Sequence, residues 1–158
     1  MFILARAITY ATFFIGLIIV YFPAGILSWS GIFRPEVIEV MQVAGIILGT
    51  GSATIALWCV FTFVIIGRGT PAPFDPPRRL VIMGPYRFVR NPMYIGAGLT
   101  LVSAALFFES IQLLGFVGLF FLIAHLFVML YEEPTLRRTF GQEYEAYCRH
   151  TRRWWPGR

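Results

Sequence analysis

Residues 111–131 read IQLLGFVGLFFLIAHLFVMLY, and Glu132 and Glu133 follow them directly. The stretch contains no Asp, Glu, Lys or Arg. About 20 consecutive apolar residues are enough to carry an α-helix across the hydrocarbon core of a bilayer. The stretch therefore predicts a transmembrane helix that ends at two adjacent carboxylates.

The rest of the chain is similarly apolar, since 58% of its 158 residues are hydrophobic and 13% are charged. A soluble domain carries about a quarter charged residues. This composition excludes a soluble globular protein, a disordered chain and a disulfide scaffold. Three further apolar runs cover residues 6–22, 37–66 and 92–108. We predict a single all-α domain over residues 1–158, an integral membrane bundle of about four transmembrane helices.

The first run could instead be a cleavable signal peptide, because its one charged residue, Arg6, precedes the apolar part. It ends in Tyr21-Phe22-Pro23, without a small-residue cleavage site, so a retained anchor followed by a loop over residues 23–35 is favoured. The second run contains Gly45 and Gly49, a spacing that lets another helix approach closely. Packing within the bundle is favoured over a dimer contact, and the oligomeric state stays open.

The arginines predict the orientation in the membrane. All 13 basic residues are arginine, and with four spans 12 of them lie on one side, leaving Arg34 alone on the other. The positive-inside rule then places both termini and the loop over residues 67–91 in the cytoplasm. The net charge of +5 is explained by this topology, so no nucleic-acid partner is indicated.

The tail, residues 132–158, is polar and predicts one amphipathic helix on the cytoplasmic side. Leu136, Phe140, Tyr144 and Tyr147 recur at helical spacing along one face. Such a helix would lie on the membrane surface or fold back onto the bundle. The sequence Trp154-Trp155-Pro156 then predicts an interfacial anchor at its end.

A first polar segment, GPYRFVRNPMY at residues 84–94, leads into the third run. Pro92 suits the first turn of a helix and Asn91 suits its cap. Free N–H groups at this helix start, with Arg87 and Arg90 beside them, would suit a carboxylate or a phosphate. The alternative is a capped helix whose arginines touch lipid phosphates.

The second polar segment begins with Glu132 and Glu133. Acids near hydrocarbon are costly unless they are paired. Glu133 can pair with Arg137 four residues on. Glu132 has no such partner, which suggests Arg90, Arg87 or a cationic ligand. His125 lies seven residues before Glu132 and so on about the same helix face, although a lone histidine in a span is more often a packing residue.

Other kinds of site are not indicated. Two histidines and two cysteines without ligand spacing predict no metal site. Cys59 and Cys148 are predicted to be unpaired. The chain has no nucleophile elbow, no phosphate-binding glycine loop and no dinucleotide-binding fingerprint.

Three motifs in order carry a family resemblance: the segment at 84–94, the pattern EExxLxxxFGxxYxxY at 132–147, and RWxP at 153–156. Together they resemble the isoprenylcysteine carboxyl methyltransferase family, which includes phospholipid methyltransferase-like relatives. The match covers about residues 78–156, the catalytic half. One departure is Asn91, where many members have histidine, so no titrating base is expected at this position.

The resemblance implies an integral membrane enzyme that transfers a methyl group from S-adenosylmethionine at the cytoplasmic face. The product would be S-adenosylhomocysteine, and a lipid-like acceptor would arrive from the bilayer. Glu132, Arg149 and Arg153 are the expected catalytic residues, the arginines holding an acceptor carboxylate. The expected cofactor-binding residues are Tyr86, Arg90, Asn91, Pro92, Tyr94, His125, Glu132, Glu133, Tyr144 and Tyr147.

The favoured acceptor is the carboxylate of an isoprenylcysteine-like lipid, because its methylation needs no general base. The alternative within the same chemistry is N-methylation of a phospholipid amine. A different class, a non-enzymatic four-helix transporter or packing subunit, is disfavoured because a transporter would place charges in mid-span. Glu39 and Arg6 lie near the ends of their runs.

Overall fold

The computed structural model describes residues 9, 12–32, 35–67 and 78–156. Regular structure in these ranges is helical throughout. The α-helices are α2 (Phe22–Trp29), α3 (Val40–Thr62), α4 (Pro92–Phe107), α5 (Ile111–Phe127), α6 (Glu133–Phe140) and α7 (Gln142–His150). Three π-helical segments (Gly16–Tyr21, Phe63–Gly67 and Val128–Glu132) and a 3₁₀ turn (Gly84–Arg87) complete the set.

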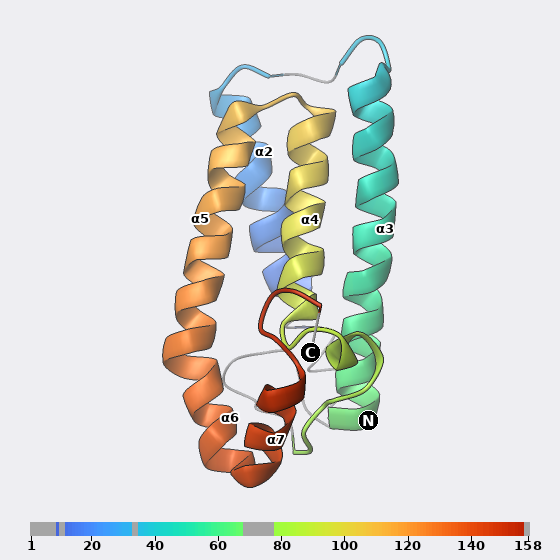
Figure 1. Cartoon of the computed structure of the whole chain (residues 1–158). Helices are drawn as coiled ribbons and strands as arrows, with labels where there is room; N and C mark the ends of the chain where they lie inside the picture. The colour runs from blue at the N-terminus through green and yellow to red at the C-terminus, as the bar shows by residue number, and fades with distance from the viewer. Residues whose placement is uncertain (1–8, 10–11, 33–34, 68–77, 157–158) are drawn as a thin grey trace.

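The long helices stand side by side, with α4 between α3 and α5 (Figure 1). Among the described residues, three helical stretches are long and apolar enough to cross a membrane: Thr12–Trp29, Val40–Gly67 and Ile111–Phe140. The fourth, α4, is a shorter apolar helix of 16 residues. The prediction of an all-α chain with helices apolar enough to span a membrane is therefore confirmed, while the count of four spans stays a prediction.

The first helix continues further than the sequence indicated. The predicted span ended at Phe22 and a loop was expected from Pro23, but the chain stays helical through Trp29. Proline lacks the N–H that an α-helix interior requires. The π-helical turn Gly16–Tyr21 ends two residues before Pro23 and widens the helix there. This widened turn lets the helix pass the proline, so the expected loop is wrong over residues 23–29.

The small residues of α3 serve packing inside the chain. A Cβ atom at Gly45 would lie 2.8 Å from the carbonyl oxygen of Ser103, and one at Gly49 would lie 2.9 Å from the Ser103 Oγ. Both glycines therefore let α3 approach α4 closely. Next along the same interface, the hydroxyls of Ser52 and Thr100 are 2.9 Å apart.

The tail forms two helices, so the prediction of a single helix is wrong. Gly141 separates α6 from α7 with a φ of 51° and a ψ of −122°, a backbone conformation that only glycine adopts easily. In Figure 1 α6 continues from the end of α5, α7 turns back, and the C-terminal segment runs toward the start of α4. This return brings the tail onto the bundle.

Candidate active site

Three segments far apart in the sequence meet where α4 begins and α5 ends. They are residues 86–94, residues 125–133 and the tail from Tyr144 to Trp154. The first two contain the polar motifs found in the sequence. Contacts between side chains of all three segments define the candidate site.

Glu133 lies at the centre of this group and is 5% exposed. Arg153 donates to it twice, from Nε to Oε1 at 2.7 Å and from Nη2 to Oε2 at 2.9 Å. Arg90 Nη1 lies 3.4 Å from the same Oε1. The hydrogen bond to Glu133 raises the pKa of the Arg153 guanidinium further above its ordinary value, so this charge is permanent.

The expected pairing of Glu133 with Arg137 is wrong. Arg137 instead pairs with Glu145, Nε to Oε1 at 3.1 Å, on the exposed side of the tail. Gly141 reverses the chain between α6 and α7 and so brings Glu145 beside Arg137. The turn also returns Arg153 to Glu133, and a buried bidentate contact is stronger than an exposed helical pair.

Arg90 ties the start of α4 to the tail. Its backbone N–H donates to the carbonyl of Arg152 at 2.9 Å, and its Nη1 donates to the Sγ of Cys148 at 2.6 Å. Its Nε is buried and has no hydrogen-bond partner within the described ranges. A buried donor without a partner costs free energy, and an anionic group that reached this N–H would offset that cost. Both cysteines are free thiols, as expected.

Asn91 precedes α4 and Pro92 begins it, as predicted. However, the Asn91 side chain makes no capping hydrogen bond to α4. Its Nδ2 donates instead to the carbonyl of Arg153 at 3.2 Å. Asn91 thus holds the tail, and the prediction of a side-chain cap is wrong.

Glu132 has a different environment from its neighbour. It ends the π-helical turn Val128–Glu132, and the hydroxyl of Tyr94 donates to its Oε2 at 3.2 Å. No ion pair with Glu132 is formed in the part of the chain that the structure describes, and the suggested partners are engaged elsewhere. Arg90 contacts Glu133, and Arg87 lies 5.2 Å from the ring centre of Phe88. Glu132 therefore keeps its capacity to bind a cationic group.

His125 faces the same region, as its spacing from Glu132 predicted. Its Nδ1 accepts a hydrogen bond from the indole Nε1 of Trp154 at 3.0 Å. Trp154 also packs edge-on to Tyr94, with ring centres 6.5 Å apart. His125 and Glu132 thus both reach the pair formed by Tyr94 and Trp154.

Three of the expected cofactor residues form a packing group instead. The Tyr147 hydroxyl donates to the carbonyl of Tyr86 at 2.5 Å, and the rings of Tyr144 and Tyr147 lie 6.2 Å apart. Burial raises the pKa of all three tyrosine hydroxyls, so they remain protonated donors. They join α7 to the segment before α4.

Of the two arginines expected to hold an acceptor, Arg153 is bound to Glu133 and Arg149 is exposed near the end of α7.

The sequence did not assign Trp154 or Cys148 to the site. The RWxP motif at 153–156 contained the signal for Trp154, which was interpreted as a membrane anchor. Nothing near Cys148 in the sequence indicated its contact with Arg90. No cluster of metal-ligating side chains is present in the described ranges.

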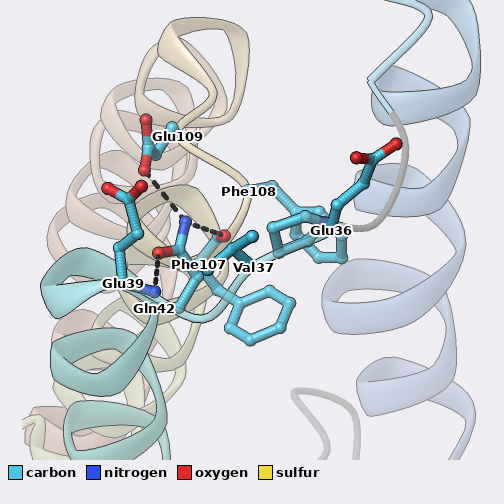
Figure 2. Close-up of a pocket in the computed structure, with 8 residues that line it drawn as sticks. Glu36, Val37, Glu39, Gln42, Phe107, Phe108 and Glu109 are labelled. Carbon is cyan, nitrogen blue, oxygen red and sulfur yellow. Dashed lines mark hydrogen bonds between the residues drawn. The ribbon is translucent and has the colours of Figure 1, made fainter.

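A second polar group lies at the opposite end of the bundle, where the α4–α5 turn meets the start of α3 (Figure 2). Gln42 donates from Nε2 to Glu109 Oε1 at 2.9 Å and to the Phe107 carbonyl at 3.3 Å, and accepts from the Glu39 N–H at 3.0 Å. The hollow beside it measures about 330 Å³. Its other lining residues are Pro35, Glu36, Val37 and Phe108. These bonds hold α3 to the α4–α5 turn, far from the candidate site.

The comparisons with known proteins agree with the resemblance. The family model described as phospholipid methyltransferase matches residues 44–143. The matched region covers α3 from residue 44 onward and all of α4, α5 and α6, and so includes Arg90, Tyr94, Glu132 and Glu133. No curated protein and no solved structure matches the chain. The tail residues Arg153 and Trp154 lie beyond the matched region.

Proposed function

This chain belongs to the phospholipid methyltransferase family, and on that premise we propose that it transfers a methyl group from S-adenosylmethionine to a lipid-linked acceptor. The family and the three apolar helices together make it an integral membrane methyltransferase. The cofactor, the acceptor and the residues that bind them are the proposed part.

The observation that carries the proposal is one donor without a hydrogen-bond partner and one carboxylate without an ion-pair partner among the described residues of the site. Arg90 offers a buried Nε–H donor, and Glu132 offers a carboxylate bonded to the Tyr94 hydroxyl. S-adenosylmethionine has a carboxylate and an amino group, so these two residues fit its amino-acid part. The methyl group that the cofactor supplies is electrophilic because it is attached to a positively charged sulfur.

The neighbouring residues would hold these two groups in place. Glu133 pairs with Arg153 and with the Nη1 of Arg90. The Nε of Arg90 makes no such contact, and the packing around the side chain holds it in place. Tyr94 fixes one oxygen of Glu132. Methyl transfer is an in-line displacement, and fixed alignment supplies most of its acceleration. A rigid pair of anchors for the cofactor is therefore the main contribution that this chain can make.

The first candidate acceptor is the carboxylate of an isoprenylcysteine-like lipid. Such an acceptor needs a cation and no base, and Arg149 at the end of α7 is the exposed cation of the expected pair. In this reaction Glu132 would bind the amino group of the cofactor.

The second candidate is a phospholipid amine. It is favoured by the engagement of Arg153 with Glu133, because only one of the two arginines is left for an acceptor carboxylate. An amine must also lose a proton when it is methylated. Glu132 could accept that proton, whereas Glu133 is committed to its arginines.

The deciding experiment supplies purified protein in lipid with methyl-labelled S-adenosylmethionine and a panel of prenylcysteines, fatty acids and phosphatidylethanolamine. Label that base releases identifies an ester, and base-stable label in the lipid identifies an N-methyl amine. At a limiting cofactor concentration, Glu132→Gln should strongly reduce labelling, while the matched control Glu143→Gln, on the exposed surface of α7, should not. Absence of label in every lipid, with folded protein, would contradict the proposed function.

A further inference from the structure

Residues 151–156, here called the C-terminal strap, run from the end of α7 back to the start of α4 (Figure 1). The strap is attached by consecutive residues. The Arg152 carbonyl accepts from the Arg90 N–H, the Arg153 carbonyl accepts from Asn91, and the Arg153 side chain bonds Glu133. These contacts bring the next residue, Trp154, against side chains of both α4 and α5.

The Trp154 indole contacts aromatic rings of both helices. Its ring centre lies 6.5 Å from Tyr94 of α4, and 6.3 Å from Phe121 and 6.1 Å from His125 of α5. Its Nε1–H donates to the Nδ1 of His125. A tryptophan that lies against apolar rings needs a partner for this N–H, and His125 provides it. The indole is therefore held by packing and by one directional bond.

The adjacent tryptophan behaves differently. Trp155 is 76% exposed, as expected for an interfacial anchor, whereas Trp154 turns inward. The two residues are identical in type and one position apart, so the difference in placement comes from the partners that α4 and α5 present. The anchor interpretation therefore fits Trp155 and does not fit Trp154.

We propose that Trp154 is a positioning residue that latches the C-terminal strap over the Tyr94–Glu132 pair and controls how fast a ligand bound there exchanges. Tyr94 is the link, since its ring packs against Trp154 while its hydroxyl holds Glu132. A ligand at Glu132 lies beneath the strap, so the strap must open before the ligand leaves. This inference rests on the proposed function for the identity of the ligand.

The latch can be measured without a ligand. The Arg90 N–H donates to the strap at Arg152, so its hydrogen exchange reports strap opening. Trp154→Phe keeps an aromatic ring but removes the bond to His125. We expect it to accelerate exchange of the Arg90 amide by about threefold to tenfold, the effect of losing one neutral hydrogen bond. Trp155→Phe is the matched control and should leave this exchange unchanged.

The same variants test control of the ligand. With S-adenosylhomocysteine as the probe, Trp154→Phe should raise the association and dissociation rate constants together, and change the Kd less than either rate. His125→Ala should have the same effect, and the double variant should add little, because both remove one bond. A change in melting temperature alone would indicate a merely structural role.

Two results would overturn the latch: unchanged Arg90 exchange in Trp154→Phe, or faster exchange with unaltered ligand rates. Failure of the wild-type protein to bind S-adenosylhomocysteine is a separate result. It would contradict the proposed function, while accelerated Arg90 exchange would still support the latch.

Discussion

At the scale of single residues, the adjacent side chains of Glu133 and Glu132 have opposite roles. Glu133 is buried and bonded by Arg153 and Arg90. Removing one partner of a buried pair leaves the other charge uncompensated, which costs about 3–5 kcal/mol. Because Arg153 is partly exposed, we expect Glu133→Gln to lower the free energy of unfolding by about 3 kcal/mol. Denaturant titration in detergent measures this value.

The control for this prediction is Glu143→Gln on the exposed surface of α7, which should change stability by less than about 0.5 kcal/mol. Equal stability of wild type and Glu133→Gln would show that the arginines do not depend on this carboxylate. The pairing of Glu133 with Arg137 that the sequence suggested would have made its removal nearly neutral.

Glu132→Gln should give the opposite result. The amide oxygen can still accept from Tyr94, and no ion pair among the described residues is lost, so the apo protein should be as stable as wild type or more so. Binding of S-adenosylhomocysteine should weaken by about 1.5–3 kcal/mol, the range for a hydrogen bond to a charged group. Thermal shifts of each variant with and without the ligand measure both effects.

Two other results for Glu132→Gln have distinct meanings. Unfolding of the apo protein with an intact ligand-induced shift would make Glu132 a structural residue. Intact ligand binding with lost turnover would favour the phospholipid amine, with Glu132 as the proton acceptor.

At the scale of elements, the contact between α4 and α5 depends on Gly98. A Cβ atom there would lie 2.1 Å from the Phe121 Cζ, and Phe121 in turn supports Trp154. Gly98→Ala must displace this ring, and overpacking of a core costs about 1–3 kcal/mol. We expect a lower melting temperature and, since Trp154 loses its support, faster exchange of the Arg90 amide.

Gly118→Ala on α5 is the matched control, because a Cβ there meets no atom within 4 Å. Alanine is the better helix former, so this variant should be neutral or slightly stabilising. A similar loss of stability in both variants would show that helix flexibility, and not the Phe121 contact, explains the glycine at 98.

At the scale of the whole molecule, the orientation in the membrane remains to be measured. The 12-to-1 division of arginines predicts that Trp29 and Glu109 face outward and that Arg138 and Trp155 face the cytoplasm. In a background without Cys59 and Cys148, single cysteines at the first two positions should react with an impermeant reagent on intact cells. Those at the last two should react only after permeabilisation.

Labelling of Glu109 and Trp155 from the same side would show that α5 does not cross the membrane. A second result would overturn the predicted orientation of the first helix. In it, cysteines at Arg138 and Glu109 react from opposite sides, and a cysteine at Trp29 reacts from the same side as the one at Arg138. Residues 68–77 of the loop predicted to be cytoplasmic, and residues 157–158 at the C-terminus, lie outside the described residues.

The sequence by itself determined the helical fold class and the apolar runs, and its motifs indicated the chemistry. Apolar runs without charges indicate membrane helices, since in lipid the hydrogen bonds within a helix pair all of its own backbone N–H and C=O groups. Pro92 marked the start of α4 because proline suits a first helical turn. The motifs containing Arg90, Tyr94 and Glu132 resemble those of a methyltransferase family. They could be found in the sequence because each is a local pattern. Gly141 was visible as well, but its role as a break became evident only from its backbone conformation.

Only the tertiary structure decided which polar groups meet. Glu133 bonds Arg153, 20 residues away, and Asn91 bonds the Arg153 carbonyl, 62 residues away. Helical spacing can suggest a partner four residues on, such as Arg137, but it cannot compare that exposed partner with a buried one from another segment. Trp154 and Trp155 carry the same side chain, and their different burial depends on where the strap crosses α4 and α5. Long-range contacts of this kind depend on the position of the whole chain, and no local pattern encodes them.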